Sequence, residues 1–290
     1  QIEVYEDDSA ADVLETIFEE CSQERFVFVL DEWDFIFHKD FITEENKKQY
    51  IQFLSNLLKD RPYVQMTYMT GILPIKKLKT QSALNNFDEF TMLDAGRLVS
   101  FVGFTEDEVK TLCEKYRMDF EQVKKWYDGY CFGKTEIYNP WSILNYLYMG
   151  KNDPDYLPRP YWSNTSSNSI VREMVAEADD EAKEDLETLM NGGTIEKRVH
   201  EDITYGDIHQ TQDNLWNFLF FTGYLKKVSE RKDAAGETLY LTMKIPNTEV
   251  KTIYRESISY WFDQRMKETD RGPLLHALET GDCAAAENFI

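Results

Sequence analysis

The sequence lacks several features that would assign a protein to a class at once. Its four cysteines form no C-x-x-C pair, so neither a zinc site nor a disulfide-rich scaffold is expected. No window approaches the ~18 consecutive apolar residues that a membrane span needs, and no membrane partner is expected. The chain starts at Gln1 and its start is acidic, so we expect no signal peptide; either a segment was removed upstream or the sequence is a fragment. Reduced thiols in the cytoplasm are the default expectation.

Basic residues are few relative to acidic ones. Lys and Arg total 32 against 53 Asp and Glu, which gives a formal net charge of −21. Broad, charge-driven binding to nucleic acid needs clustered Lys and Arg, so this balance disfavours it but leaves a local basic patch open. Histidine is scarce too, and the four residues show no ligand spacing: His38, His200, His209 and His276. We expect them to be surface or packing residues.

The sequence also lacks the run G-x-x-x-x-G-K-[ST], whose backbone N–H groups cradle phosphates. The nearest string, Gly129 to Thr135, has three residues between its glycines instead of four. It follows a helical pattern that ends near Trp126, and two bulky aromatics fill its loop. We therefore do not interpret it as a phosphate-binding loop.

The most informative feature that is present is the apolar run Phe26 to Leu30, which ends in Asp31 and Glu32. Such a run predicts a parallel strand that is buried on both faces. Acidic groups at the carboxyl end of such a strand lie where open α/β sheets bind ligands. This is the form of a Walker B strand, in which the Asp holds Mg²⁺ through water and the Glu polarises the attacking water. A core strand that runs into a polar turn is the alternative interpretation.

A second strand is predicted at 63–72, after a helix that Thr43 caps and Arg61 to Pro62 ends. Strand, helix and strand over ~45 residues form a βαβ unit with parallel strands, whose carboxyl ends share one edge. Thr70 is therefore expected near Asp31 and Glu32. Many P-loop ATPases place a sensor of the γ-phosphate at this position, and a threonine that closes a strand before a glycine turn is the alternative.

The rest of the N-terminal part is predicted from local signals. Ala10 to Glu20 has helical spacing of its apolar residues, and the apolar residues of 98–102 predict a third strand. Arg97 precedes that strand. It could serve as an arginine finger, but a solvated arginine is the favoured interpretation.

From Thr105 onward the sequence becomes mainly helical. Thr105 to Glu108 is a capping box, and Asn139-Pro140 begins a helix that ends at Gly150. An acidic helix is expected at 171–190. A helix at 213–222, two strands at 224–228 and 239–245, and a helix after Asn247 then predict a winged-helix module. Given the net charge, we expect it to serve in packing rather than in DNA binding.

Eight short motifs, in order and with consistent spacing, cover nearly the whole chain. They are Leu30-Asp31-Glu32-Trp33-Asp34, Met69-Thr70-Gly71-Ile72, Ser82-Ala83-Leu84-Asn85-Asn86, Gly103-Phe104-Thr105-Glu106-Asp107-Glu108-Val109, Trp126-Tyr127-Asp128-Gly129-Tyr130 with Phe132-Gly133, Ile137-Tyr138-Asn139-Pro140-Trp141-Ser142, Phe221-Thr222-Gly223-Tyr224-Leu225 and Ile245-Pro246-Asn247-Thr248-Glu249-Val250. Together they resemble the predicted AAA-ATPase-like family of bacteria, whose members often carry a C-terminal PD-(D/E)XK nuclease-like domain. That family usually has Tyr where this chain has Trp33.

The resemblance implies a fold that is α/β at first and then mostly α. It implies a partial P-loop NTPase core with a parallel sheet at 1–102, a helical lid at 103–170, a winged-helix-like domain at 171–270 and the start of a linker at 271–290. The family's Walker A motif would lie upstream of Gln1. Asp31 carries over as the Mg²⁺-binding carboxylate, Glu32 as the catalytic base and Thr70 as a sensor in an ATP site.

Three hypotheses for function follow. The first is an ATP-dependent switch in the full-length protein, with nucleotide and Mg²⁺ as ligands and with this chain inactive by itself. The second is a non-enzymatic scaffold, a degenerate NTPase fold that binds a protein partner or DNA. The third is direct nucleic-acid recognition through the basic residues of the predicted wing: Lys226, Lys227, Arg231, Lys232 and Lys244.

Overall fold

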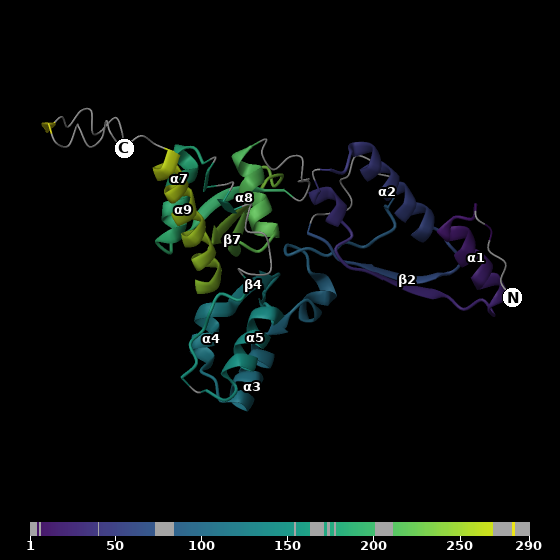
Figure 1. Ribbon diagram of the computed structural model, residues 1–290, viewed down its shortest axis with the longest axis horizontal. Coiled ribbons are helices and arrows are strands. Elements are labelled where there is room, and N and C mark those ends of the chain that lie inside the picture. Colours follow the sequence, from purple (N-terminus) through teal and green to yellow (C-terminus); the bar gives the residue numbers. More distant parts are fainter. Residues whose placement is uncertain are drawn as a thin grey trace. The chain divides into compact units, whose positions relative to one another are not determined.

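The computed structural model shows a mixed α/β chain in which helices accompany small sheets (Figure 1). It describes residues 5, 7–39, 41–72, 84–153, 155–162, 171–172, 175–176, 178–200, 211–268 and 280–281. Four of the sequence predictions lie wholly or largely outside these ranges: the roles of His209 and His276, the thiol of Cys283, and the linker at 271–290. Part of the third motif, Ser82-Ala83, also lies outside them.

Among the described residues, the first part of the chain contains α-helices, strands and 3₁₀ helices. They are α1 (Ala10–Glu20), β1 (Phe26–Leu30), η1 (Phe35–His38), α2 (Glu44–Leu58), β2 (Val64–Met69) and η3 (Gly96–Phe101). The next segment contains β3 (Phe104–Thr105), α3 (Glu106–Tyr116), α4 (Phe120–Tyr127), β4 (Asp128–Phe132), β5 (Thr135–Tyr138) and α5 (Pro140–Gly150). The last contains α7 (Asp180–Met190), β6 (Ile195–Val199), α8 (Gln212–Phe221), β7 (Lys226–Lys232), β8 (Leu239–Lys244) and α9 (Thr248–Glu268).

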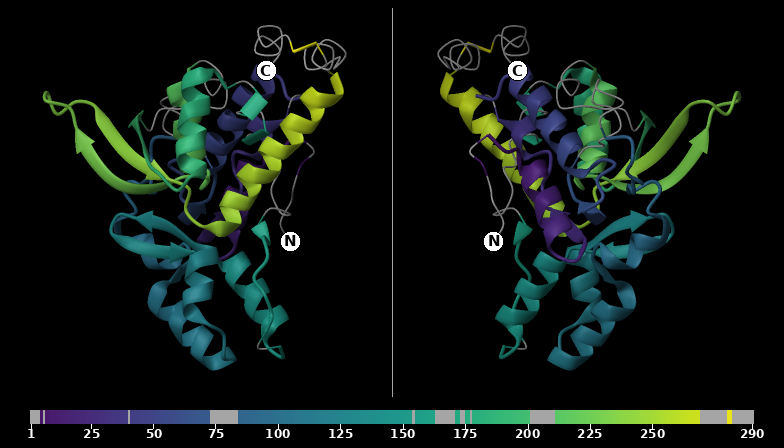
Figure 2. Two further views of the ribbon diagram at one scale, coloured as in Figure 1. Left: turned by 90° about the vertical axis from the view of Figure 1, so that its left-hand side faces the viewer. Right: turned by 90° about the vertical axis from the view of Figure 1, so that its right-hand side faces the viewer.

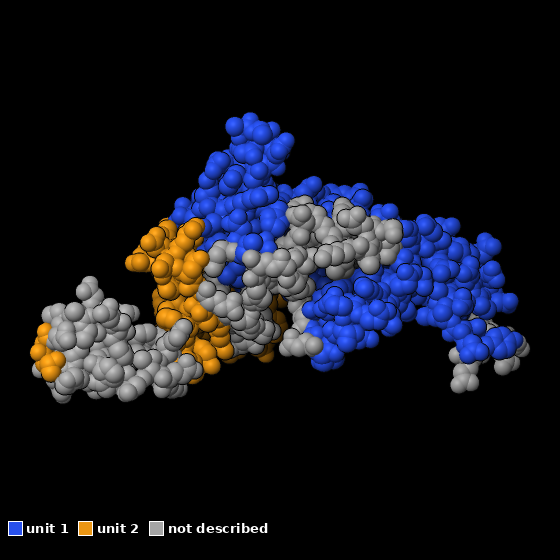
Figure 3. Space-filling model, turned by 90° about the horizontal axis from the view of Figure 1, so that it is seen from above, with its two compact units in different colours: residues 1–103, 130–137, 194–244 blue, residues 104–129, 138–193, 245–290 orange. Residues whose placement is uncertain are grey.

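The chain divides into two compact units, which Figure 3 shows in different colours. Unit 1 contains residues 1–103, 130–137 and 194–244, and unit 2 contains residues 104–129, 138–193 and 245–290. The predicted domain boundary at 102/103 falls within one residue of a boundary between the units. The predicted boundaries at 170 and 270 do not coincide with the units, because each unit collects segments from distant parts of the sequence.

Helix starts follow the predicted capping residues. Thr43 accepts a hydrogen bond from the N–H of Asn46, and Thr105 accepts one from the N–H of Glu108, so both helices begin with a capping box. Asn139 caps α5, and Pro140 occupies its first position, where no intrahelical N–H is needed. The predictions of these three helix starts are confirmed.

β1, α2 and β2 form the predicted βαβ unit. The two strands pair in parallel, with Val29 opposite Tyr68 and Leu30 opposite Met69. Phe28, Leu30 and Met69 pack against buried residues of α2 such as Leu54. In Figure 1, α2 runs along one side of the two strands.

Among the described residues, β1 is buried on one face only, so the prediction that it is buried on both faces is wrong. Its residues alternate between partly buried and exposed, and Val27 and Val29 point to solvent. Only the face toward α2 is covered, because the described residues supply a helical layer on that side alone.

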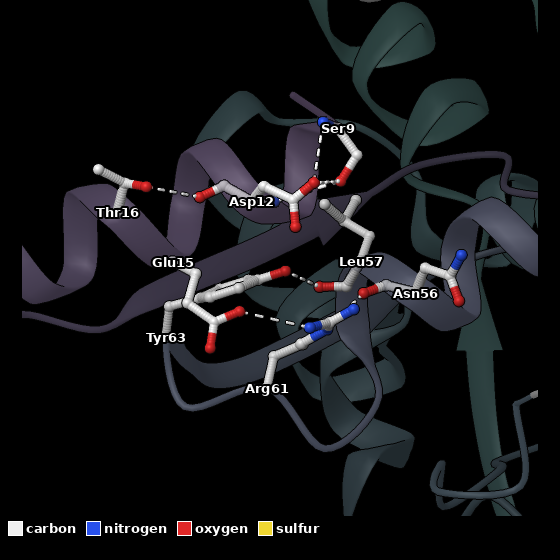
Figure 4. A network of polar contacts seen from close by, with 8 residues as sticks. All are labelled: Ser9, Asp12, Glu15, Thr16, Asn56, Leu57, Arg61 and Tyr63. Atoms are coloured by element: carbon white, nitrogen blue, oxygen red, sulfur yellow. Dashed lines mark hydrogen bonds and ion pairs between the residues drawn. The ribbon is translucent and has the colours of Figure 1, made fainter. Parts of the chain in front are cut away.

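α1 is held beside the end of α2 by a network of polar contacts (Figure 4). Glu15 forms an ion pair of 3.4 Å with Arg61, whose Nε donates to the carbonyl of Asn56 at 2.6 Å. The Tyr63 hydroxyl donates to the carbonyl of Leu57 at 2.7 Å. These bonds occupy carbonyls of the last turn of α2, which no intrahelical N–H reaches.

The prediction of a third strand at 98–102 is wrong. This segment is the 3₁₀ helix η3, and Phe101 is 82% exposed. A short apolar run does not distinguish a strand from another local structure unless a neighbouring strand edge pairs with it. Within the described residues, the sheet of β1 and β2 has two strands only.

Two three-stranded sheets have the orders β3-β5-β4 and β6-β8-β7, and both pairings of the latter are antiparallel. The β7–β8 hairpin is an extended ribbon in Figure 2. α8, β7, β8 and α9 confirm the predicted order of helix, strand, strand and helix. The sequence analysis missed β6, whose Ile195 and Val199 are buried while the charged residues between them are not.

The core of unit 2 is rich in tyrosine. Tyr127, Tyr138 and Tyr146 are buried together with Val109 and Ile143.

In the part of the chain that the structure describes, no helix combines the length and the apolar character that a membrane span requires.

Candidate functional site

The carboxyl ends of β1 and β2 bring together the residues that the sequence singled out. The Thr70 hydroxyl donates a hydrogen bond to Oδ1 of Asp31. The backbone N–H of Glu32 lies 3.3 Å from the same hydroxyl oxygen. The parallel pairing causes this proximity, since the N–H of Thr70 donates to the carbonyl of Leu30 at 2.9 Å. Asp31, Glu32 and Thr70 therefore form one cluster at the edge where parallel sheets bind ligands.

The backbone at Glu32 has a left-handed conformation, with φ of 51°. A residue with a Cβ adopts this conformation at an energetic cost, and such residues are concentrated at functional sites. The N–H of the next residue, Trp33, donates to the carbonyl of Thr70 at 2.9 Å and holds the turn. The Asp31 and Glu32 side chains are both exposed, so their carboxylates are accessible to a ligand.

Trp33 and Asp34 turn inward and fix the cluster to the sheet. Trp33 is buried against α2 and makes an edge-to-face contact with Phe37, with ring centroids 5.7 Å apart. Asp34 is 2% exposed, and its Oδ2 accepts from the N–H of Ile72 at 2.9 Å. The Tyr50 hydroxyl of α2 donates to the carbonyl of Trp33 at 2.9 Å. The sequence analysis gave no role to Asp34, although its place two residues after Glu32 was a usable signal.

Gly71 permits the two strand ends to approach each other closely. A Cβ at this position would lie 2.4 Å from Nε1 of Trp33 and 2.9 Å from Oδ1 of Asp34. Both distances are shorter than a van der Waals contact allows. The Thr70-Gly71 motif therefore supplies a hydroxyl for the cluster and the space that the buried Trp33 needs.

The cluster fits one side of a Mg²⁺-nucleotide site. Mg²⁺ usually keeps several waters and is bound through one or two carboxylates together with phosphate oxygens, and the exposed Asp31 provides a carboxylate that could hold one of those waters. Among the described residues no group of three His, Cys, Asp or Glu side chains could hold a metal by itself. A metal ion here would therefore need further oxygen ligands from water or from a bound ligand.

The opposite side, a cradle for phosphates, is not provided by Gly129 to Thr135. That segment lies in β4, the following turn and β5, and Gly133 has φ of 62° in the turn. A P-loop leads from a strand into the N-terminus of a helix, and a second strand follows here instead. The segment therefore does not have the form of a P-loop, as the sequence predicted.

A hollow of about 650 Å³ lies beside β2 and reaches Thr70. Arg97 of η3 lines it and is exposed. Its exposure fits the favoured prediction of a solvated arginine, and no contact with another described residue assigns Arg97 a catalytic role.

The basic residues of the predicted wing are largely paired with acids. Lys226 is buried and lies 2.6 Å from a carboxylate oxygen of Glu136. Lys227 pairs with Glu230 at 2.9 Å, and Nε of Arg231 donates to Glu196 at 2.8 Å. Such ion pairs reduce the positive charge available to a nucleic-acid backbone.

Three of the other motifs meet in unit 2, where they hold the start of α9. The Asn247 side chain donates to the carbonyl of Asp128 at 3.0 Å. Glu249 is buried and accepts from the Ser142 hydroxyl at 2.7 Å and from the N–H of Trp162 at 2.8 Å. Burial raises the pKa of the Glu249 carboxyl. This arrangement gives these motifs a structural explanation.

Comparison with known proteins finds a distant relative but assigns the chain to no family. No model of a protein family matches the chain, and no solved structure matches it. A protein of Azotobacter chroococcum mcd 1, described as an uncharacterized protein in the vnfD 5′ region, is 27% identical over 160 residues. The aligned part is 53% of this chain but 30% of the relative, so the chain covers less than a third of the relative's length.

Proposed function

We propose that this chain is part of an AAA-ATPase-like protein that acts as an ATP-dependent switch. The observation that carries the proposal is the contact between Asp31 and Thr70 at the carboxyl ends of two parallel strands. In this proposal the chain contributes the metal-binding side of a triphosphate pocket. The phosphate-binding loop belongs to sequence upstream of residue 1.

Each residue of the cluster has a distinct proposed role. Asp31 holds Mg²⁺ through water, and Glu32 accepts the proton of the attacking water. The Thr70 hydroxyl, which can donate to one acceptor at a time, exchanges its bond to Asp31 for one to the γ-phosphate. Mg²⁺, when bound, neutralises charge on the phosphate oxygens.

In this proposal the rest of the chain changes position when the nucleotide in the pocket is bound or hydrolysed. We propose that 103–170 acts as a helical lid and that the segment with α8, β7, β8 and α9 is a winged-helix-like packing module. Three of the five basic residues of the wing are paired with acids, namely Lys226, Lys227 and Arg231. This pairing favours packing over nucleic-acid recognition. The cytoplasm remains the proposed compartment, and no disulfide joins Cys21, Cys113 or Cys131 in the described part.

The second candidate is a scaffold with a degenerate NTPase fold that binds a protein partner or DNA. The absence of G-x-x-x-x-G-K-[ST] from the sequence favours it. Sequence upstream of residue 1 distinguishes the two candidates. A strand, a phosphate-loop motif and a helix there support the switch, and their absence from the gene supports the scaffold.

The test of the switch is hydrolysis by the complete gene product carrying Glu32→Gln. Removal of a general base lowers turnover by about 10²–10⁴-fold, and the isosteric amide leaves nucleotide affinity unchanged. Residues 1–290 alone are expected to show no ATP binding by calorimetry with Mg²⁺ at micromolar protein concentration. Unchanged turnover of the variant would remove Glu32 from the mechanism, and micromolar binding by residues 1–290 would show that no upstream loop is needed.

A further inference from the structure

Helix α5 of unit 2 is apolar on its outward face as well as on its inward face. Every exposed position of the helix carries an apolar or aromatic side chain: Trp141 is 51% exposed, Leu144 51%, Tyr148 65% and Met149 52%. The opposite side of the helix is apolar too, because Ile143 and Leu147 are buried in the core of unit 2. A helix that is apolar all round is normally buried, so this outward face is expected to meet another molecule.

Two other helices of unit 2 show how a solvated helix face is built in this protein. The exposed positions of α3 and of α7 are all occupied by Asp, Glu, Lys or Thr. These helices also bury an apolar stripe, which includes Val109 and Cys113 in α3 and Leu186 and Leu189 in α7. They therefore have the ordinary amphipathic pattern of a surface helix, and α5 departs from it.

The segment 156–161 runs beside α5 and leaves its outward face exposed. At one end of the helix, a Cβ on Gly150 would lie 3.3 Å from a ring carbon of Tyr156. At the other end, the indole N–H of Trp141 donates to the carbonyl of Tyr161 at 3.3 Å. Leu157 of this segment is 69% exposed. The exposed apolar surface around α5 therefore extends beyond the helix itself.

The charge of the chain indicates what kind of molecule fits this face. Residues 137–152 contain no Asp or Glu, whereas the whole chain has 53 of them among 290 residues. Two copies of a protein with a net charge of −21 repel each other wherever their carboxylates meet. The acid-free face of α5 avoids this repulsion, so it suits contact with a second copy. A basic partner would instead be attracted to the acid-rich faces.

The order of side chains along α5 fits a symmetric pair of helices. At 1.5 Å per residue, Trp141 and Tyr148 lie about 10 Å apart along the axis, with Leu144 midway between them. In an antiparallel pair related by a two-fold axis, Trp141 of each copy contacts Tyr148 of the other, and the two Leu144 side chains meet near the axis. Nζ of Lys151 lies 4.2 Å from the centroid of the Tyr148 ring, so in such a pair it is also close to Trp141 of the other copy.

We propose that the protein forms a symmetric dimer in which the outward faces of two antiparallel α5 helices pack against each other. A fully covered aromatic side chain buries about 150–250 Å², so the four half-exposed side chains of α5 contribute on the order of 400 Å² per copy. A stable interface typically buries about 800 Å² per partner. The dimer is therefore weak, with a Kd of about 10–100 μM. It does not depend on nucleotide binding.

The test is sedimentation equilibrium of the protein at concentrations from about 1 to about 300 μM. The average mass is expected to rise from that of one chain toward that of two. Leu144→Glu is expected to weaken the dimer at least about tenfold, because it places two carboxylates at the axis. Val228→Glu adds the same charge at another apolar position that is 50% exposed, so it is the matched control and is expected to dimerise like the unmodified protein. A monomer at every concentration, or equal effects of the two substitutions, overturns the proposal.

A mixture of opposite charges at the axis separates loss of the interface from misfolding. Leu144→Glu and Leu144→Lys are each expected to be monomeric alone and to associate when mixed, because unlike charges then meet. A misfolded chain would not regain the dimer, and a mixture that stays monomeric contradicts the antiparallel pair. If these variants do not fold, mild oxidation of Asn145→Cys decides. It is expected to give more disulfide-linked dimer than the unmodified protein, which keeps the native cysteines, and an equal yield overturns the proposal.

Discussion

The residues after β1 divide into an outward pair and an inward pair. Asp31 and Glu32 are exposed, and Trp33 and Asp34 are buried. The buried pair is held by the Tyr50 hydroxyl and by the N–H of Ile72, so the exposed carboxylates stand on a fixed turn. A site gains precision when buried neighbours hold its reactive groups in place. The cluster therefore has a rigid base even though its acids face solvent.

Gly71→Ala is expected to destabilise the protein. The added Cβ would lie 2.4 Å from the Trp33 indole nitrogen and 2.9 Å from Oδ1 of Asp34, and both of these side chains are buried, so at least one of them must shift. Overpacking of this kind costs about 1–3 kcal/mol of the free energy of unfolding, which urea denaturation measures. The matched control is Gln65→Ala at an exposed position of the same segment, expected to change it by about 0.5 kcal/mol or less. Equal effects of the two substitutions would show that the close approach is not rigid.

At the scale of single residues, the sequence predicted that Asp31 and Glu32 lie near Thr70. It did not predict the structural roles of Asp34 and Gly71. The proximity follows from strand order alone, because parallel strands end at one edge. The close contact between Gly71 and Trp33 depends on how a large side chain packs, and periodicity carries no information about that.

Among the elements, α9 illustrates how distant motifs converge on one helix terminus. Its first turn receives bonds from Ser142 and from the N–H of Trp162 through Glu249, and Asn247 both accepts from the N–H of Val250 and donates to the carbonyl of Asp128. A carboxylate in the first turn also complements the helix dipole. These bonds tie segments of unit 2 that are about a hundred residues apart in sequence.

Glu249→Gln is expected to change the pH dependence of stability. Burial raises the pKa of Glu249 in the folded protein, so its stabilising contribution is fully present below about pH 4.5 and is lost as the pH rises through the folded pKa. The amide does not ionise. The stability of the unmodified protein relative to the variant should therefore fall as the pH rises above about 4.5 and should level off above the folded pKa, as measured by denaturation at each pH from about 4 to 8. Glu256→Gln, an exposed position of the same helix, is the control. A constant difference for Glu249→Gln over this range would contradict the buried, costly charge.

Helix ends were the best predicted elements, and strands the least well predicted. Capping at Thr43, Thr105 and Asn139 is a local interaction, so residue types at fixed spacing identify it. β6 was missed and the segment at 98–102 was misassigned because strand formation depends on a partner that is distant in sequence. The partner of β6 is β8, and the paired residues lie forty or more positions apart in sequence.

For the whole molecule, the two units interleave along the sequence, since each is built from three segments. A contiguous division such as 103–170 and 171–270 cannot reproduce this arrangement, because nothing in local composition records which segments return to the same core. The net charge of −21 is also a property of the whole chain. This negative charge disfavours binding to nucleic acid over a broad surface, but it does not exclude a local site for a nucleotide.

The measurement that tests the central claim most directly is Mg²⁺-dependent ATP binding by the complete gene product, with Asp31→Asn as the matched variant. The amide oxygen of the variant still accepts the bond from Thr70, but its charge is gone. We predict micromolar binding for the unmodified protein in the presence of Mg²⁺. The variant is expected to bind at least about tenfold more weakly with Mg²⁺ and equally well without it. Absence of ATP binding, or equal affinities of the two proteins with Mg²⁺, would contradict the assignment of these strand ends to a triphosphate site.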